Sequence, residues 1–544
     1  PIVDTRAATA MGSLHLISDE KTIWSVRRDL RRLARDPQID GIAVVNSHPQ
    51  LSLSITLELI AALKEFKASG KTVVFYQDYM SSTDFLLAAA VGDQVYLHPG
   101  GMIDFKGLAL SQPYLEQFLA RFGVEIDNFR SHPHKSSYNF LTESEMTEAE
   151  REAFSALLGS LQDEMLRLIR EGRGERLQAP IESLLENGPY LVAEDAVKDG
   201  LVDELIRQDR FTEKLSSQGV SVTLRSRMPA EPFRRDWSDP ARKKVAVINA
   251  VGPIHSGEGA PGSSIGEKTL SDAIRAARTD PTVSGILLRV NSGGGSALAS
   301  EMIAREIEMT VTGDDSLPLV VSMGATAASG GYYITAYADR IIAYPTTLTG
   351  SIGVIGVVPH IEDLLREQEI AWETVKTSEQ ADMGAVYRDL SESEREKLRA
   401  AIMHTYDRFV AAVSDGRDME KSAVDEAARG RVWSGRQAAE RGLVDEIGGI
   451  DTALAALREE IGTEHPLKLA DYTYRGVFPA LSLGGTSSAL LDLTQPDFLP
   501  AELAAVHPAL NSAYLRILKG DKGYHDYTLA VMPYSFPEIT AERE

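Results

Sequence analysis

Residues 327–333 read AASGGYY and follow an apolar, β-branched segment, 318–323, of the kind that forms a short buried strand. The next residues, 333–338, are typical of a helix packed tightly on that strand. Ser329 is therefore predicted to lie at a strand-to-helix turn, where its hydroxyl projects and the first amides of the helix stay free. The two following glycines let the backbone of a ligand approach closely. The alternative is that Ser329 only caps a helix and that the glycines only permit tight packing.

Strands and helices alternate through the first half of the chain. Buried strands are predicted at 41–45, 72–76, 94–97 and 125–130, and helices near 22–34, 54–67 and 114–122. This alternation predicts an α/β fold with right-handed crossovers.

The second half of the chain repeats the first. Four segments of the first half match four segments of the second half, in the same order and at nearly the same distance along the chain. For the first pair, 36–42 and 280–286, the distance is 280 − 36 = 244 residues. The other pairs are 93–99 with 339–345, 147–152 with 391–396, and 200–205 with 442–447. A tandem duplication explains this pattern. We expect an N-terminal repeat over 1–225, a C-terminal repeat over 226–544 with an extension after about residue 467, and an Arg/Pro-rich linker between the two.

Composition narrows the classes of function. The chain has 544 residues, of which 43% are hydrophobic, 25% are charged and none is cysteine, so disulfides, thiol catalysis and cysteine metal sites are excluded. Its net charge of −23 disfavours nucleic acid as a partner and favours cationic peptides.

No run of apolar residues in the sequence approaches the roughly 18 residues that a membrane span needs. The chain begins at Pro1, so we expect that an anchor or signal segment preceded it, and that copy one lacks the strand that copy two has at 245–251.

The two copies diverge where chemistry is expected. Subtracting 246 from 329 gives Thr83, which has no glycine pair after it, and subtracting 244 from the glycine loop 293–295 leads to residues 49–51, which contain no glycine. Copy one therefore cannot host the same serine site.

A nucleophilic serine needs a group that takes its proton. Copy two offers His255, His360 and His404, and histidine is the usual base. A lysine made neutral by burial is the alternative, and Lys135 in copy one is the candidate. Its counterpart in copy two is Glu379 (135 + 244), so the copies look complementary. The other interpretation of Lys135 is a solvated loop lysine.

The segment 290–296, VNSGGGS, follows a predicted strand at 285–290 and precedes a predicted helix at 297–308. Its glycines let backbone amides face a substrate, as an oxyanion site requires, and the amide of Gly330 is a possible second donor. A phosphate-binding loop is the rival interpretation, but neither GxxxxGK[ST] nor GxGxxG fits the sequence.

These motifs, together with 347–353 (TLTGSIG), resemble the signal peptide peptidase A family in its long tandem form, within the ClpP/crotonase superfamily, from residues 1–2 to about residue 449. The resemblance implies two tandem ClpP/crotonase-like β/α repeats and a serine endopeptidase that degrades cleaved signal peptides. It implies that Ser329 is the nucleophile, that Lys135 is the general base and that Ser351 orients the lysine. The oxyanion donors would be Gly330 and the loop at Gly294 and Gly295.

The resemblance also implies a membrane anchor and a location on the periplasmic face of the inner membrane. It implies a bowl-shaped homotetramer that binds signal peptides and other hydrophobic peptides and that uses no cofactor or metal. One departure is the loop 292–295, SGGG, where members of the family usually have SPGG. The segments 472–483 and 532–544 match no motif, and we expect them to form oligomer contacts. A crotonase-like acyl-CoA enzyme and a non-catalytic peptide-binding scaffold remain as alternatives.

Overall fold

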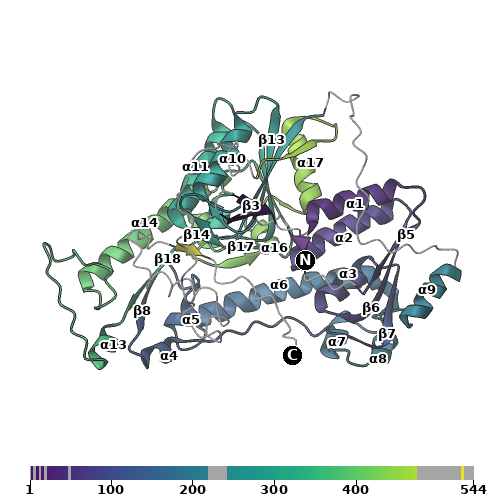
Figure 1. Ribbon diagram of the computed structural model, residues 1–544, viewed down its shortest axis with the longest axis horizontal. Helices are drawn as coiled ribbons and strands as arrows, with labels where there is room; N and C mark the ends of the chain where they lie inside the picture. Colours follow the sequence, from purple (N-terminus) through teal and green to yellow (C-terminus); the bar gives the residue numbers. More distant parts are fainter. Residues whose placement is uncertain are drawn as a thin grey trace.

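The computed structural model describes residues 2–3, 8–11, 14–17, 21–46, 51–217, 242–473 and 529–531. The first half of the chain (purple to blue) and the second half (teal to green) each build a sheet with helices packed on it (Figure 1). The predicted boundary near residue 225 lies outside the described residues. Within the described ranges, no helix combines the length and the apolar character that crossing a bilayer requires.

Copy one contains a four-stranded parallel sheet in the order β5-β6-β7-β9. The four predicted strands are confirmed, and two of them run further than expected: β5 (Gly41–Val45), β6 (Thr72–Met80), β7 (Gln94–Ile103) and β8 (Glu125–Arg130). Strand β9 (Glu204–Leu205) is not predicted from the sequence. Short N-terminal strands pair among themselves: β1 (Ile2–Val3) with β4 (Lys21–Thr22), and β2 (Ala8–Met11) with β3 (Leu14–Ile17). The helices are α1 (Ile23–Arg35), α2 (Leu53–Ala68), α3 (Ser82–Val91), α4 (Glu116–Ala120), α5 (Asn139–Thr142), α6 (Glu148–Arg173), η1 (Gly174–Arg176), α7 (Ile181–Glu186), α8 (Ala193–Lys198) and α9 (Gln208–Ser217).

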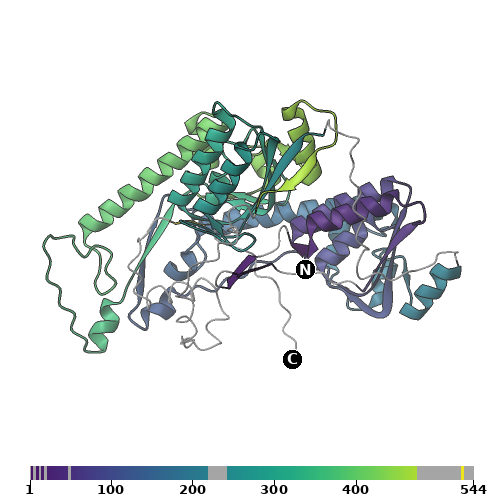
Figure 2. The same ribbon diagram turned by 45° about the horizontal axis from the view of Figure 1, so that its top comes forward.

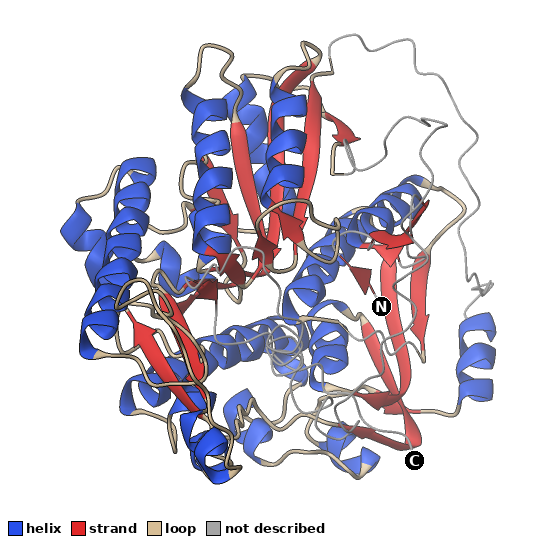
Figure 3. Cartoon of the chain, turned by 60° about the vertical axis from the view of Figure 1, so that its left-hand side comes forward, coloured by secondary structure: helices blue, strands red, loops and turns tan. Residues whose placement is uncertain are grey.

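Copy two contains an eight-stranded sheet in the order β19-β17-β15-β13-β10-β21, with β16 and β20 extending from β15. Its strands are β10 (Lys244–Val251), β13 (Val283–Ser292), β15 (Leu319–Ala328), β16 (Arg340–Ala343), β17 (Leu348–Gly350), β19 (Val432–Ser434), β20 (Glu446–Ile447) and β21 (Lys468–Asp471). Helices lie in front of and behind these strands (Figure 3). They are α10 (Glu267–Arg278), α11 (Ala297–Thr312), α12 (Gly330–Tyr333), α13 (Glu362–Glu367), α14 (Glu392–Arg417), α15 (Lys421–Ala427), α16 (Gly435–Ala439) and α17 (Ile450–Ile461).

A six-stranded sheet joins the two copies. Its order is β12 (Ile265–Gly266), β11 (Ile254–His255), β14 (Gly294–Ser296), β22 (Leu529–Val531), β18 (Ile355–His360) and then β8 of copy one. Strands β8 and β18 pair antiparallel from Arg130↔Ile355 to Glu125↔His360. Helix α6 extends from copy one beneath the body of copy two, as two views agree (Figures 1 and 2). The chain after β8 is thereby brought to copy two.

The helix after Ser329 differs from the prediction. Helix α12 spans Gly330–Tyr333, and the residues that follow it form turns rather than the helix expected at 333–338. The hydroxyl of Thr335 donates to the carbonyl of Tyr332 (2.7 Å), a local bond that competes with a continuing helix. Gly330 and Gly331 lack side chains, so helix α12 can begin almost directly after strand β15.

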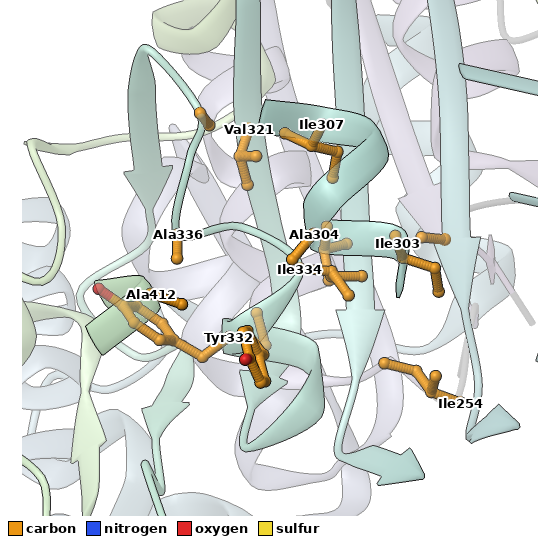
Figure 4. Close-up of a cluster of buried hydrophobic side chains, with 14 of the residues drawn as sticks. Ile254, Ile303, Ala304, Ile307, Val321, Tyr332, Ile334, Ala336 and Ala412 are labelled. Carbon is orange, nitrogen blue, oxygen red and sulfur yellow. The ribbon is translucent and has the colours of Figure 1, made fainter. Parts of the chain in front are cut away.

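A buried apolar cluster fixes α12 in place. Ile303 and Ile307 of α11, Val321 of β15 and Tyr332 of α12 are inaccessible to solvent and belong to one buried cluster (Figure 4). The hydroxyl of Tyr332 donates to the carbonyl of Leu443 (2.9 Å), so this aromatic ring has no unsatisfied polar atom. The strand-to-helix turn therefore rests on a closely packed support.

Part of the segment after residue 467 belongs to the fold. Strand β21 pairs parallel with β10 at the sheet edge, and the buried Tyr472 donates to Asp280 and accepts from Lys244 (2.7 Å). Of the segments expected to form oligomer contacts, 472–483 is described only at Tyr472 and Thr473, and 532–544 lies outside the described residues.

Candidate active site

Lys135 of copy one meets Ser329 of copy two in the interior of the protein. The Lys135 Nζ donates to the Ser329 Oγ over 2.7 Å. It also lies 2.9 Å from the carbonyl oxygen and 3.0 Å from the Oγ of Ser351. All three residues have an exposed fraction of 0%. The three side chains that the sequence singles out are thus brought into one buried hydrogen-bonded group.

The register of two neighbouring strands places both serines. Strands β15 and β17 run parallel with Ala328 opposite Gly350, so the residues that follow them emerge at the same sheet edge. The amide of Ser329 donates to the carbonyl of Gly350 (2.8 Å). Ser329 has a φ of 56° and Ser351 a φ of 49°, a left-handed conformation that is uncommon outside glycine. Such strain is held only where the surroundings enforce it, and it clusters at functional sites.

The corresponding turn in copy one is an ordinary helix start. Ser81 caps α3 in a capping box with Asp84, and Thr83 lies in the first turn of that helix. The side chain of Ser329 makes no capping hydrogen bond to α12. The helix-cap alternative for Ser329 therefore does not describe its side chain, which is bonded to Lys135 instead.

Burial decides the protonation of Lys135. The side chain is enclosed, so its ammonium form loses hydration, and this desolvation lowers the pKa of Lys135 well below its ordinary value. The solvated-loop interpretation of this lysine is therefore wrong. Its repeat counterpart, Glu379, is exposed on the surface.

Several contacts fix the loop that carries Lys135. The amide of Ser131 donates to the carbonyl of Val354 (2.9 Å), which continues the pairing of β8 with β18. Further along, the buried Asn139 accepts from Arg130 (2.5 Å) and donates to Glu150 on α6 (3.1 Å). Burial raises the pKa of Glu150. These bonds connect the loop to both a strand and a helix.

The glycine loop lies beside α12. The amide of Gly294 donates to the Oγ of Ser292 (3.1 Å), and this hydroxyl donates to the carbonyl of Gly252 (2.7 Å). A Cβ built on Gly330 would lie 3.2 Å from the nitrogen of Gly295. The amide of Gly294 is thus engaged within the loop, whereas that of Gly295 lies next to Gly330.

Two of the three candidate histidines have other partners. His255 contacts the Oγ of Ser264 (3.1 Å), and the Nδ1 of His360 lies 2.7 Å from Asp389. His404 is exposed on α14. In the described part of the chain, the basic group bonded to Ser329 is Lys135.

Sequence reasoning missed two residues of the site. Gly430 lies against the backbone of Lys135, and the carbonyl of Arg431 accepts from the amide of Ser351 (2.7 Å). No local motif marks either residue, because both act through backbone atoms that only folding brings close.

Comparison with known proteins identifies the family. The model of Peptidase family S49 matches residues 65–222 and 312–464. "Protease 4" of Salmonella typhi is 34% identical over 81% of this chain and 72% of its own length. "Serine protease SPPA, chloroplastic" of Arabidopsis thaliana is 28% identical over 79% of this chain and 64% of its own length. The solved structure of ClpP1 from Listeria monocytogenes matches 37% of this chain and 91% of its own, at 15% identity and a TM-score of 0.24. This α/β chain, which the family model matches in two separate stretches, belongs to peptidase family S49.

Proposed function

We propose that this peptidase is a serine endopeptidase in which Ser329 is the nucleophile and Lys135 is the general base, and that it degrades signal peptides and similar hydrophobic segments at a membrane. One observation carries the proposal: the Nζ of a fully buried lysine lies 2.7 Å from the hydroxyl of a serine at a strained turn. A neutral amine at that distance is within reach of the proton that it must remove.

In the acylation step, the Ser329 Oγ forms a bond to the carbonyl carbon of the scissile peptide while its proton passes to Lys135. The resulting ammonium then gives that proton to the leaving amine as the C–N bond breaks, which leaves an acyl ester on Ser329. A water molecule attacks the ester in the same manner, with Lys135 again accepting a proton, and this releases the acid and restores the serine.

Ser351 has a positioning role. Its hydroxyl and its carbonyl both lie within 3.0 Å of the Lys135 Nζ, and they hold the amine toward Ser329. The amides of Gly295 and Gly330 are the proposed donors to the oxyanion, because the nitrogen of Gly295 lies 3.2 Å from where a Cβ on Gly330 would stand and the amide of Gly294 is already bonded to Ser292. Donors fixed in advance stabilise the developing negative charge without reorganisation.

Strand β14 has extended neighbours on both sides. It pairs with β11 on one side, and on the other the described strand β22 pairs antiparallel with it, with Gly294 opposite Val531 and Ser296 opposite Leu529. A substrate peptide that bound here by strand addition would therefore take the place that β22 occupies next to Gly295. The net charge of −23 attracts segments with a basic end, as signal peptides have.

Hydrolysis of a synthetic peptide with a basic end and an apolar core tests the proposal. Ser329→Ala and Lys135→Met are each expected to lower kcat by about a thousandfold or more, as losses of a catalytic unit do. Thr83→Ala, at the matching position of copy one, is the control and is expected to retain wild-type rates.

Peptide turnover that survives Ser329→Ala would overturn the nucleophile assignment. Peptide binding without turnover in the wild-type protein would instead indicate a scaffold. Acyl-CoA turnover that survives Ser329→Ala would indicate a crotonase-like enzyme.

A further inference from the structure

Two glycines of copy two lie against Lys135. A Cβ built on Gly430 would lie 2.6 Å from both the backbone nitrogen and the Cβ of Lys135. A Cβ built on Gly353 would lie 3.2 Å from the Cδ of Lys135 and 2.7 Å from the Cα of Gly430. Side chains at either position would therefore occupy space that the lysine and its neighbouring backbone fill.

The backbone around these glycines is fixed. Gly430 has a φ of 79°, in the left-handed region that favours glycine, and its amide donates to the carbonyl of Ile352 (2.8 Å). The next residue, Arg431, accepts from the amide of Ser351 (2.7 Å). The segment formed by Gly430 and Arg431 therefore holds Ser351 through a hydrogen bond and packs directly against Lys135 where Gly430 has no side chain.

We propose that Gly430 and Gly353 are positioning residues for Lys135. Because neither residue has a Cβ, their Cα atoms pack closely against Lys135, hold its amine toward Ser329 and exclude water from it. This inference rests on the proposed function, because it assigns the two glycines a role in that proton transfer. Close backbone approach is the use for which glycine is suited.

A side chain at residue 430 is expected to displace Lys135 and to admit water around its amine. Misplacement of a reacting group by about 1 Å can cost roughly a hundredfold in rate. Renewed hydration favours the ammonium form, so the pH at which the amine becomes a base rises. A glycine that served the fold alone would lower stability without moving that pH.

The test compares kcat/KM for a fluorogenic hydrophobic peptide from pH 6 to pH 10 in full-length Gly430→Ala, Gly353→Ala and Gly442→Ala, with thermal unfolding as a check on folding. Gly442 is the matched control, because its φ of 72° imposes similar backbone strain while a Cβ there would meet nothing closer than 3.6 Å. We expect the first two variants to lose about tenfold to a hundredfold in kcat/KM and to shift the rising limb to higher pH. The control is expected to do neither.

Unchanged pH profiles in folded Gly430→Ala and Gly353→Ala would overturn the inference. If Gly430→Ala does not fold, Gly353→Ala decides alone, since residue 353 carries no left-handed strain. Ser329→Ala in the same assay separates the two proposals. Activity retained there refutes the proposed function, whereas activity lost there with wild-type pH profiles in the glycine variants refutes only the positioning role.

Discussion

The Lys135 Nζ lies 2.7 Å from the Ser329 Oγ although 194 positions separate the two residues along the chain. The contact forms within a single chain, because β8 of copy one adds to the sheet that contains β14 and β18 of copy two. A lysine of the first copy and a serine of the second can meet in this way when one strand crosses from the first copy to the second. Four predictions follow from the contacts of this site and of the interface behind it.

The activity is expected to rise with pH. Below the pKa of Lys135 the amine is protonated and cannot act as a base, and burial places this pKa well below its ordinary value. The kcat/KM of the wild-type protein is therefore expected to increase from acid toward alkaline pH and to level off before an exposed lysine titrates, near pH 10.4. A profile measured from pH 5 to pH 10 checks this, and a rate that falls above pH 6 would contradict it.

Ser351→Ala is expected to lower kcat/KM by about tenfold to a hundredfold, through loss of orientation rather than loss of the base. The variant removes the Oγ at 3.0 Å from Lys135 and retains the carbonyl at 2.9 Å. Steady-state kinetics of peptide hydrolysis measure the effect. Ser160→Ala is the control, because it removes a hydroxyl contact with Ser434 outside this group (2.7 Å). Equal rates in Ser351→Ala and the wild type would remove Ser351 from the orienting role.

Lys135→Met is expected to change how stability depends on pH. The unfolded chain keeps the Lys135 proton up to about pH 10.4, whereas the folded protein releases it at lower pH. Between these values unfolding takes up a proton, so the free energy of unfolding of the wild type rises with pH. The variant lacks this rise. Its stability relative to the wild type is expected to be highest below the folded-state pKa of Lys135 and to fall as the pH rises from there toward 10, as urea unfolding at several pH values can measure. A constant difference would show that Lys135 is hydrated in the folded state.

Glu58→Leu is expected to destabilise the interface between the copies. Glu58 on α2 is fully buried, and it lies 2.9 Å from Arg27 and 3.4 Å from Arg289 on β13 of copy two. Removing one member of a buried ion pair costs about 3–5 kcal/mol, because the remaining charge loses its partner. Glu65→Leu, in which an exposed partner of Arg31 is removed, is the control and is expected to cost less than about 1 kcal/mol. Urea unfolding measures the loss of stability in both variants. Equal losses would show that the ion pairs of Glu58 add nothing to the stability of the interface.

Local sequence predicted much of the framework. The strand and helix pattern of 41–130 and the duplication at a spacing near 244 both correspond to observed elements. It failed at α12, which ends at Tyr333 and is followed by turns in which the hydroxyl of Thr335 donates to the carbonyl of Tyr332, although composition alone favours a helix there. Propensity is a weak guide where tertiary contacts decide the end of an element.

The sequence by itself determined which residue types are available: a serine before two glycines, a glycine loop, and a lysine in the copy that lacks both. Only the tertiary structure decided that Lys135 is buried, that Gly430 abuts it and that its amine meets Ser329. The physical reason is that desolvation and hydrogen bonding depend on which atoms surround a group, and those atoms come from segments far apart in the chain.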